Sequence, residues 1–155
     1  MELRDRWFDD FVEGEEFVVG PHLMTEERII SFATEFDPQR FHIDPVAAAN
    51  SIYGGLIASG WHTGSVLMKL LSSTLGESSL GSPGGDQLRW LAPVRPGDEL
   101  RLRVTIESVR PSTTKADRGV LIYRNEMLNQ NDDIVMAFTS TMFMLRRPDS
   151  PPEGA

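Results

Sequence analysis

The sequence predicts an α+β fold in which an antiparallel sheet wraps around one long buried helix. From residue 59 to residue 75, apolar side chains recur on nearly every side of a helix, which is typical of a buried helix. After residue 86 the hydrophobic period changes from helical spacing to strict alternation, which indicates successive strands. The length of 155 residues suits one domain. We assign this domain to residues 1–147 and expect residues 148–155 to be a disordered tail.

The N-terminal segment predicts one strand and one helix. A short strand is expected over residues 15–20, closed by the Gly-Pro pair that ends at Pro21, with His22 in an exposed loop. Thr25 precedes two glutamates and apolar residues spaced by three and four. Because Thr is a preferred N-cap and acids favour the first turn, we expect an amphipathic helix over residues 25–36.

Prolines and glycines divide the segment that follows. Pro38 disfavours helical backbone at the residue before it, so residues 37–42 should form a loop or an irregular turn. Asp44 followed by proline has the residue types preferred at an N-cap and a first helical position, and a short helix should run from there to Gly54. Ser59 is then expected to cap the long central helix.

The C-terminal half predicts the sheet. Leu and Val alternate with Arg, Thr and Glu over residues 100–109, which is the pattern of a half-buried strand. Polar and turn-forming residues separate this run from its neighbours. The expected strands are residues 86–94, 100–109, 120–130 and 133–147.

Composition excludes several classes of protein. A net charge of -8 argues against a nucleic-acid surface, which needs a basic face. There is no cysteine, so disulfides, thiolate metal sites and a cysteine nucleophile are excluded, and the three histidines lack metal-ligand spacing. The charged N-terminus does not resemble a signal peptide, and no run approaches the ~18 apolar residues of a membrane span. We therefore expect a cytoplasmic protein with no membrane or nucleic-acid partner and no metal.

Asp37 and His42 are the first candidates for chemistry. They lie five residues apart across a proline-containing loop, which can bring a carboxylate and an imidazole around one water molecule. Such a pair performs general acid-base catalysis. Spacing alone leaves an alternative open, in which Asp37 caps a turn and His42 is a half-buried loop residue. Asp44 has a structural explanation as the cap of the next helix.

The start of the long helix is the second candidate. The first turn of a helix carries unpaired N–H groups, and Gly60 has no side chain to block a ligand's approach. A carbonyl oxygen that gains negative charge could bind there. The alternative is a plain helix start with Ser59 as its cap. His62 could face either this site or the core.

Two segments resemble a known motif. FDPQRFHID followed by GGLIASGWH is similar to the hydratase motif of the MaoC-like dehydratases, a branch of the hotdog-fold superfamily related to the (R)-specific enoyl-CoA hydratases. LRWLAPVRPGDEL also resembles the family's strand and turn, and the likeness covers roughly residues 7–147. Gln39-Arg40-Phe41 and Ser59 depart from the usual Asn-Pro-Ile/Leu and His. The matching residues are Asp37, His42, Asp44, Gly55, Ile57, Ala58 and Gly60.

The resemblance implies a hotdog fold, with two subunits joining sheets edge to edge in a homodimer or higher even oligomer. It implies that Asp37 and His42 activate water for addition to a trans-2-enoyl thioester, as in fatty acid metabolism, while the Gly60 N–H polarises the carbonyl. The reverse reaction dehydrates a 3-hydroxyacyl thioester. The substrate would carry coenzyme A or an acyl carrier, and no separate cofactor is implied. Alternatives are a hotdog thioesterase and a non-catalytic acyl-CoA-binding or partner subunit.

Further residues are predicted to bind the substrate rather than to react with it. Those nearest the motif are Arg40, Ser59, Trp61 and His62. Basic residues near predicted loops are candidates for the phosphates of coenzyme A: Arg40, Arg89, Arg95, Lys115 and Arg118.

Overall fold

The computed structural model describes residues 1–148, and the predicted tail lies outside the described residues from residue 149 onward. It contains a five-stranded antiparallel sheet with the strand order β1-β3-β4-β5-β2. The strands are β1 (Glu16–Leu23), β2 (Gly84–Trp90), β3 (Glu99–Pro111), β4 (Arg118–Leu128) and β5 (Ile134–Leu145). The predicted α+β class and antiparallel sheet are therefore confirmed.

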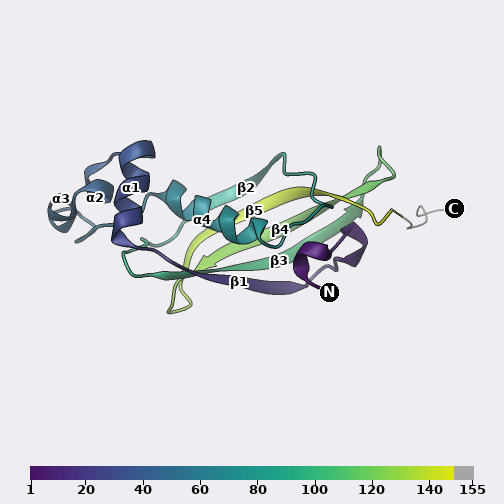
Figure 1. Ribbon diagram of the computed structural model, residues 1–155, viewed down its shortest axis with the longest axis horizontal. Helices are drawn as coiled ribbons and strands as arrows, with labels where there is room; N and C mark the ends of the chain where they lie inside the picture. The colour runs from purple at the N-terminus through teal and green to yellow at the C-terminus, as the bar shows by residue number, and fades with distance from the viewer. Residues whose placement is uncertain (149–155) are drawn as a thin grey trace.

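Four helices and two short 3₁₀ turns accompany the sheet. Figure 1 shows α4 lying along the sheet, with α1–α3 gathered beyond its N-terminal end and the two 3₁₀ turns at the opposite end of the molecule. None of the helices in the described part of the chain is long and apolar enough to cross a membrane. The elements are η1 (Leu3–Asp5), η2 (Phe8–Asp10), α1 (Glu26–Phe36), α2 (Arg40–Ile43), α3 (Pro45–Ala49) and α4 (Gly60–Ser72).

The core lies between α4 and the inner face of the sheet. Alternate residues of β3 and β4 are buried, as their sequence periodicity predicts, and they form one cluster with the buried side of α4. That side consists of Val66, Leu67, Leu70 and Leu71 together with two polar residues, His62 and Thr63. The predicted burial of this helix holds for one face only, because Trp61 and Met68 are 59% and 50% exposed. One face of the helix is enough to cover the sheet.

Two local predictions are corrected. Strand β1 continues through Pro21 to Leu23, so His22 is a half-buried strand residue paired with Leu100 and not part of an exposed loop. The register shift between Val19 and His22 accommodates the proline, which an edge strand tolerates at an irregularity.

The helical turns after α1 lie at other positions than predicted. Residues 40–43 form the helical turn α2, where a loop or an irregular turn was expected, because Pro38 restricts only the residue before it and the chain re-enters helical geometry at Arg40. The short helix α3 ends at Ala49 rather than at Gly54, and turns fill the interval. These short elements carry the chain from α1 back toward the start of α4.

Candidate active site

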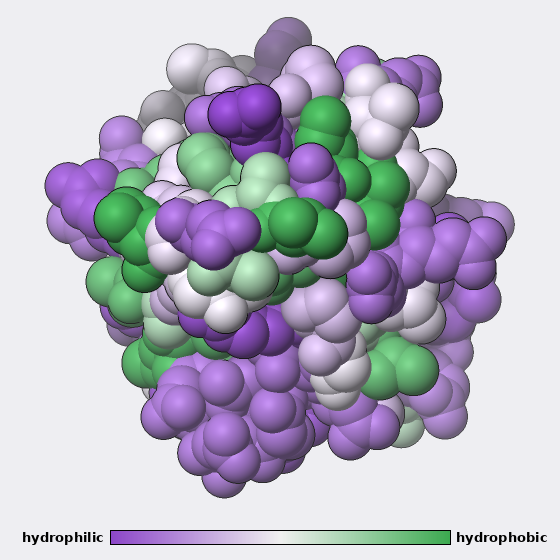
Figure 2. All heavy atoms as spheres, turned by 90° about the vertical axis from the view of Figure 1, so that its left-hand side faces the viewer, coloured by the Kyte–Doolittle hydropathy of each residue, from purple (hydrophilic) through white to green (hydrophobic). Residues whose placement is uncertain are grey.

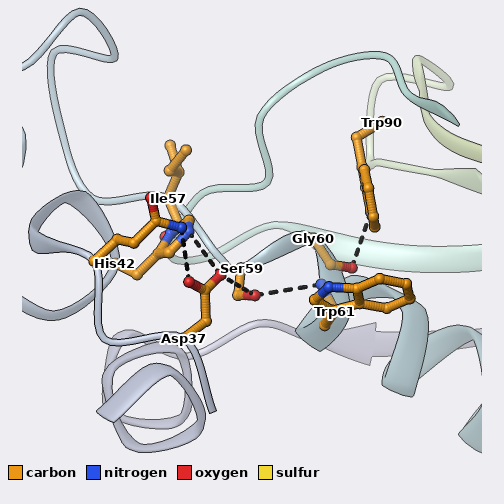
Figure 3. Close-up of polar contacts among 8 residues, drawn as sticks. Asp37, His42, Ile57, Ser59, Gly60, Trp61 and Trp90 are labelled. Atoms are coloured by element: carbon orange, nitrogen blue, oxygen red, sulfur yellow. Dashed lines mark hydrogen bonds and ion pairs between the residues drawn. The ribbon is translucent and has the colours of Figure 1, made fainter.

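The two halves predicted from the sequence meet at one place, where the end of α1 faces the start of α4. Asp37 is the C-cap of α1, and its backbone N–H donates to the carbonyl of Ala33 at 2.9 Å. Ser59 is the N-cap of α4. Figure 3 shows Ser59 and Gly60 lying between Asp37 and His42 on one side and two tryptophans on the other.

His42 is held rigidly at this junction. It lies on α2, it is 5% exposed, and its Nδ1 is 2.8 Å from the carbonyl oxygen of Ile57. A carbonyl oxygen can only accept a hydrogen bond, so Nδ1 carries the ring proton and is the donor to Ile57. In the neutral ring the lone pair is then on Nε2, which lies 3.3 Å from Oδ2 of Asp37. The backbone of Ile57 is itself fixed, since its N–H donates to the carbonyl of Phe41 at 3.1 Å.

Asp37 is a carboxylate with a hydrogen-bond donor on each oxygen. The side-chain amide of Gln39 donates to Oδ1 at 2.7 Å, and the hydroxyl of Ser59 donates to Oδ2 at 2.7 Å. Burial is the largest influence on its pKa and raises it, but the hydrogen bonds from Gln39 and Ser59 and the nearby His42 together outweigh burial. The pKa of Asp37 therefore lies below its usual value, and the group is charged at neutral pH.

The first turn of α4 offers a free donor. The Ser59 hydroxyl accepts from the N–H of Trp61 at 3.3 Å, and the carbonyl of Ser59 accepts from His62 and Thr63. The N–H of Gly60 has no acceptor among the described residues, and Gly60 lines the adjoining cavity. It is therefore available to a ligand oxygen, as the helix start predicted.

A cavity of about 470 Å³ opens beside these groups. The charged side chains that line it are Asp37 and, when protonated, His42. The rest of the lining is largely aromatic and aliphatic: Phe41, Tyr53, Ile57, Ala58, Trp61, Trp90, Leu91, Ala92, Pro93 and Val94, with Gln39, Gly60 and Thr63. Buried polar groups that converge on an apolar cavity are the usual composition of a small-molecule site.

The structure brings most of the predicted residues together, but not all. Asp37, His42, Ser59, Gly60 and Trp61 surround or support this cavity. Arg40 is exposed and does not line it, so its contact with substrate stays a prediction. The side chain of Asp44 accepts from two backbone N–H groups of α3, which confirms that it caps this helix. The four other basic residues proposed for phosphates, Arg89, Arg95, Lys115 and Arg118, also lie outside the lining.

His62 points to the other side of α4. It is 7% exposed, and its ring is stacked on Phe32 of α1 with the ring centroids 4.7 Å apart and an angle of 9° between the planes. It lines a separate cavity of about 570 Å³ between α1 and α4. Burial, and then the nearby charges of His22 and Arg28, lower the pKa of His62 to about 4. Its predicted contact with the substrate stays a prediction, since it does not border the site of Asp37 and His42.

Sequence reasoning missed two residues of the site. Gln39 stands two positions after Asp37 in a proline-containing turn, where a side-chain amide can reach back to the carboxylate, and that spacing was an available signal. Trp90 is distant in sequence, and its indole N–H donates to the carbonyl of Gly60 at 2.9 Å. The only signal for Trp90 was that a large aromatic residue stands in a predicted strand, shortly before a proline-containing turn. Nothing in the sequence shows that this strand approaches the start of α4.

Metal binding and surface apolarity add little to this site. No group of three or more His, Asp or Glu side chains within residues 1–148 could hold a metal ion. Figure 2 views the end of the molecule that carries α1–α3 and shows its hydrophobic surface broken up by hydrophilic side chains. The large exposed apolar residues of this region are Phe36, Val46 and Ile52. Of these, Phe36 lines the separate cavity beside His62.

Comparison with known proteins places these features in a family. Residues 12–123 match the family model described as MaoC like domain. The structure of a MaoC-like dehydratase from Rhodospirillum rubrum superposes with a TM-score of 0.85 at 38% identity, over 92% of this chain and 99% of that chain.

More distant structures share the fold. The R-hydratase PhaJ1 from Pseudomonas aeruginosa superposes with a TM-score of 0.73 at 20% identity, over 96% of both chains. A Mycobacterium tuberculosis protein described as having a double hotdog fold superposes with a TM-score of 0.76 at 19% identity, over 95% of this chain and 46% of that one. The predicted hotdog fold is thereby confirmed. The family model and the Rhodospirillum rubrum relative support a hydratase or dehydratase, and the chain belongs to the MaoC-like domain family.

Proposed function

We propose that the protein adds water to the double bond of a 2-enoyl thioester, or removes it from a 3-hydroxyacyl thioester, with coenzyme A as the thiol part. One observation carries the proposal: His42, Asp37 and Gly60 line one largely apolar cavity, with Nε2 of His42 3.3 Å from Oδ2 of Asp37. Hydration needs a base that takes a proton from water and a hydrogen-bond donor to the thioester oxygen. Both groups must reach the same bound substrate molecule.

His42 serves as the proton carrier in this reaction. Because Nδ1 donates its hydrogen bond to Ile57, Nε2 has the free lone pair. Nε2 accepts a proton from a water molecule that is hydrogen-bonded to Asp37. The water oxygen bonds to C3 of the substrate, and the electron pair of the C2–C3 double bond moves toward the thioester oxygen. The N–H of Gly60 stabilises the charge on that oxygen. The proton on His42 then passes to C2, so both parts of the water are added.

Asp37 stays ionised throughout. Its lowered pKa makes it a poor proton acceptor at neutral pH, but its charge orients the water and stabilises the imidazolium of His42. Ser59 and Gln39 fix the orientation of the carboxylate through one hydrogen bond to each oxygen. In the dehydration direction, neutral His42 takes the proton from C2 and then donates it to the departing hydroxyl, which leaves as water and returns His42 to the neutral state.

A spectroscopic assay with crotonyl-CoA tests this reaction. Hydration removes the absorbance of the conjugated enoyl thioester without releasing free thiol, and free thiol is measured in parallel. We expect the absorbance to fall and the thiol signal to stay at the level of the enzyme-free control. Thiol release would identify a thioesterase instead. If neither signal changes over a series of acyl chain lengths, the hydratase proposal is wrong.

We also propose that two copies associate through β2. This strand is at one edge of the sheet, and nearly all its residues are exposed. An exposed edge presents unpaired backbone groups that a second strand can satisfy. Sedimentation equilibrium should give twice the mass of the 17.3-kDa chain. A monomer mass at micromolar concentration would contradict this proposal.

A further inference from the structure

Two indole rings form one wall of the cavity beside the acid-base pair. Trp61 comes from the first turn of α4 and Trp90 from the end of β2, and they meet edge to face with centroids 5.2 Å apart and an angle of 82°. They are 59% and 45% exposed, which is unusual for side chains that are among the most apolar-rich in proteins. Figure 3 shows the pair on the side of Gly60 away from Asp37 and His42.

The ring of Trp90 is fixed rather than free to rotate. Its Nε1–H donates to the carbonyl oxygen of Gly60 at 2.9 Å. The ring lies so close to Gly60 that a Cβ atom on this residue would overlap it. Glycine at position 60 therefore both exposes an N–H to the cavity and admits the indole. A rigid aromatic surface at this place is preorganised to contact the part of the substrate that extends past the thioester carbonyl.

A second aromatic pair lines the same cavity. Phe41 of α2 and Tyr53 lie with their ring centroids 5.1 Å apart, and Phe41 also contacts the ring of His42 edge to face at 4.6 Å. The cavity thus presents four aromatic side chains around the groups proposed to react. Aromatic faces favour planar ligands through offset stacking and edge contacts, beyond the burial of apolar area.

The charge of the lining excludes another class of ligand. No Lys or Arg side chain lines the cavity within the part of the chain that the structure describes. Arg95 lies near Gly55, but its guanidinium donates to the carbonyl oxygen of Tyr53 at 2.5 Å. A second carboxylate on the acyl group would be desolvated here without a cation and would be repelled by Asp37.

We infer that the site selects acyl groups that are uncharged and carry a planar, aryl or extended conjugated substituent, which packs on the Trp61–Trp90 pair. This selectivity rests on the proposed action on acyl-CoA thioesters, and it makes Trp90 a specificity-determining residue. Dicarboxylic acyl groups are rejected.

Binding of unreactive saturated thioesters tests the inference without requiring turnover. Isothermal titration calorimetry would compare 3-phenylpropanoyl-CoA, hexanoyl-CoA, succinyl-CoA and free CoA on the intact protein. We expect the phenyl compound to bind about fivefold more tightly than hexanoyl-CoA, in line with the energy of an aromatic contact. Succinyl-CoA should bind at least about 30-fold more weakly than hexanoyl-CoA, because its second carboxylate loses water without gaining a partner.

Variants separate stacking from structural effects. Trp90→Leu and Trp61→Leu keep apolar bulk but remove the aromatic face, and Trp7→Leu is the matched control, since Trp7 is outside this cavity. Trp90→Leu should bring the ratio of phenyl to hexanoyl affinity to about one. Trp7→Leu should leave the ratio unchanged. The ratio is the readout because a merely structural loss would weaken both ligands alike, and thermal melting checks that each variant is folded.

Several results would overturn the inference. Equal binding of phenyl and hexanoyl thioesters, or binding of succinyl-CoA as tight as hexanoyl-CoA, would contradict it directly. If Trp90→Leu weakens free CoA as much as the acyl thioesters, the indoles contact the nucleotide and not the acyl group. No binding by any thioester would also overturn it. A clear phenyl preference in a protein that fails to hydrate crotonyl-CoA would instead refute the proposed reaction and leave the acyl selectivity standing.

Discussion

His42 and His62 lie on opposite sides of the N-terminal turn of α4, and they are buried to nearly the same extent, at 5% and 7% exposure. One ring nitrogen of His42 is hydrogen-bonded to the backbone carbonyl of Ile57, and the other lies near the carboxylate of Asp37. His62 has an aromatic ring stacked on its face, and its buried Nδ1 has no hydrogen-bond partner among the described residues. Burial alone therefore does not assign a histidine to chemistry, whereas its partners do.

The difference follows from the backbone that holds each ring. The carbonyl of Ile57 fixes the tautomer of His42, so its other nitrogen, which faces Asp37, is free to act as the base that we propose. Burial and nearby positive charge lower the pKa of His62 to about 4, so its ring is neutral at neutral pH. The neutral ring packs between α1 and α4 as an aromatic side chain would. The same residue type thus lies beside a carboxylate in the proposed active site on one side of the helix, and packs against an aromatic ring on the other.

The sharpest way to break this comparison is to make the same substitution at both histidines. His42→Gln should reduce kcat/KM for crotonyl-CoA hydration by about 1000-fold, the range for loss of a general base. His62→Gln should reduce it by less than about threefold, since His62 does not border the cavity. Steady-state kinetics measures both. Equal losses in the two variants would show that the distinction between the two histidines is false.

The pH dependence of stability tests the other half of the comparison. His62 has a folded-state pKa of about 4, below the ordinary value of 6.5, so the unfolded state binds more protons between these values. Stability contributed by this residue is therefore complete above pH 6.5 and falls as the pH decreases to about 4, by up to about 3 kcal/mol. His62→Phe should remove this decline. Urea unfolding at pH 7, 5.5 and 4 measures it, and an unchanged pH slope in the variant would contradict the assignment.

A pair of helix caps sharpens the distinction between support and chemistry. Ser59 and Thr25 both cap helices through their hydroxyls, but only Ser59 also donates to Asp37. Each change to alanine should cost about 1 kcal/mol of stability, as caps usually do. Ser59→Ala should also lower kcat about tenfold, because a charge-assisted hydrogen bond to the carboxylate is lost. Thr25→Ala should not change kcat, and an equal loss of kcat in both variants would refute a special role for Ser59.

The smallest effect is expected at Gln39, whose donor bond to Asp37 is exposed. Because this bond favours the charged carboxylate, Gln39→Leu should raise the pKa of Asp37. The acidic limb of the pH–rate profile should therefore move to higher pH, with kcat at neutral pH lowered roughly fivefold or less. Gln39→Glu is a second check with a like charge in place of the donor, and it should move the limb further in the same direction. If the acidic limb of the pH–rate profile does not move in either variant, Gln39 has no influence on the pKa of Asp37.

Local sequence rules were sufficient for the caps that build the site. Thr25, Asp44 and Ser59 each precede a helix, as residue type predicted, and burial alternates along β3 as expected. Asp37 and His42 were found because a proline turn separates them. These features depend on a few neighbouring residues, so a single sequence contains them.

Tertiary contacts account for what the sequence did not show. The side of α4 on which His62 lies depends on where α1 packs, and the approach of Trp90 depends on β2 pairing with β5 far along the chain. The extension of β1 past Pro21 is also set by its pairing with β3, against the local preference of proline. Exposed fractions and long-range partners cannot be obtained from periodicity alone.

The most direct test of the central claim is the Asp37→Asn variant with crotonyl-CoA. This change keeps the shape of the side chain and removes its charge. Our account predicts that kcat for hydration falls by about 1000-fold while butanoyl-CoA binds within about threefold of its affinity for the unaltered protein. Hydration at an undiminished rate by Asp37→Asn would contradict the account, because the carboxylate beside His42 would then have no part in the reaction.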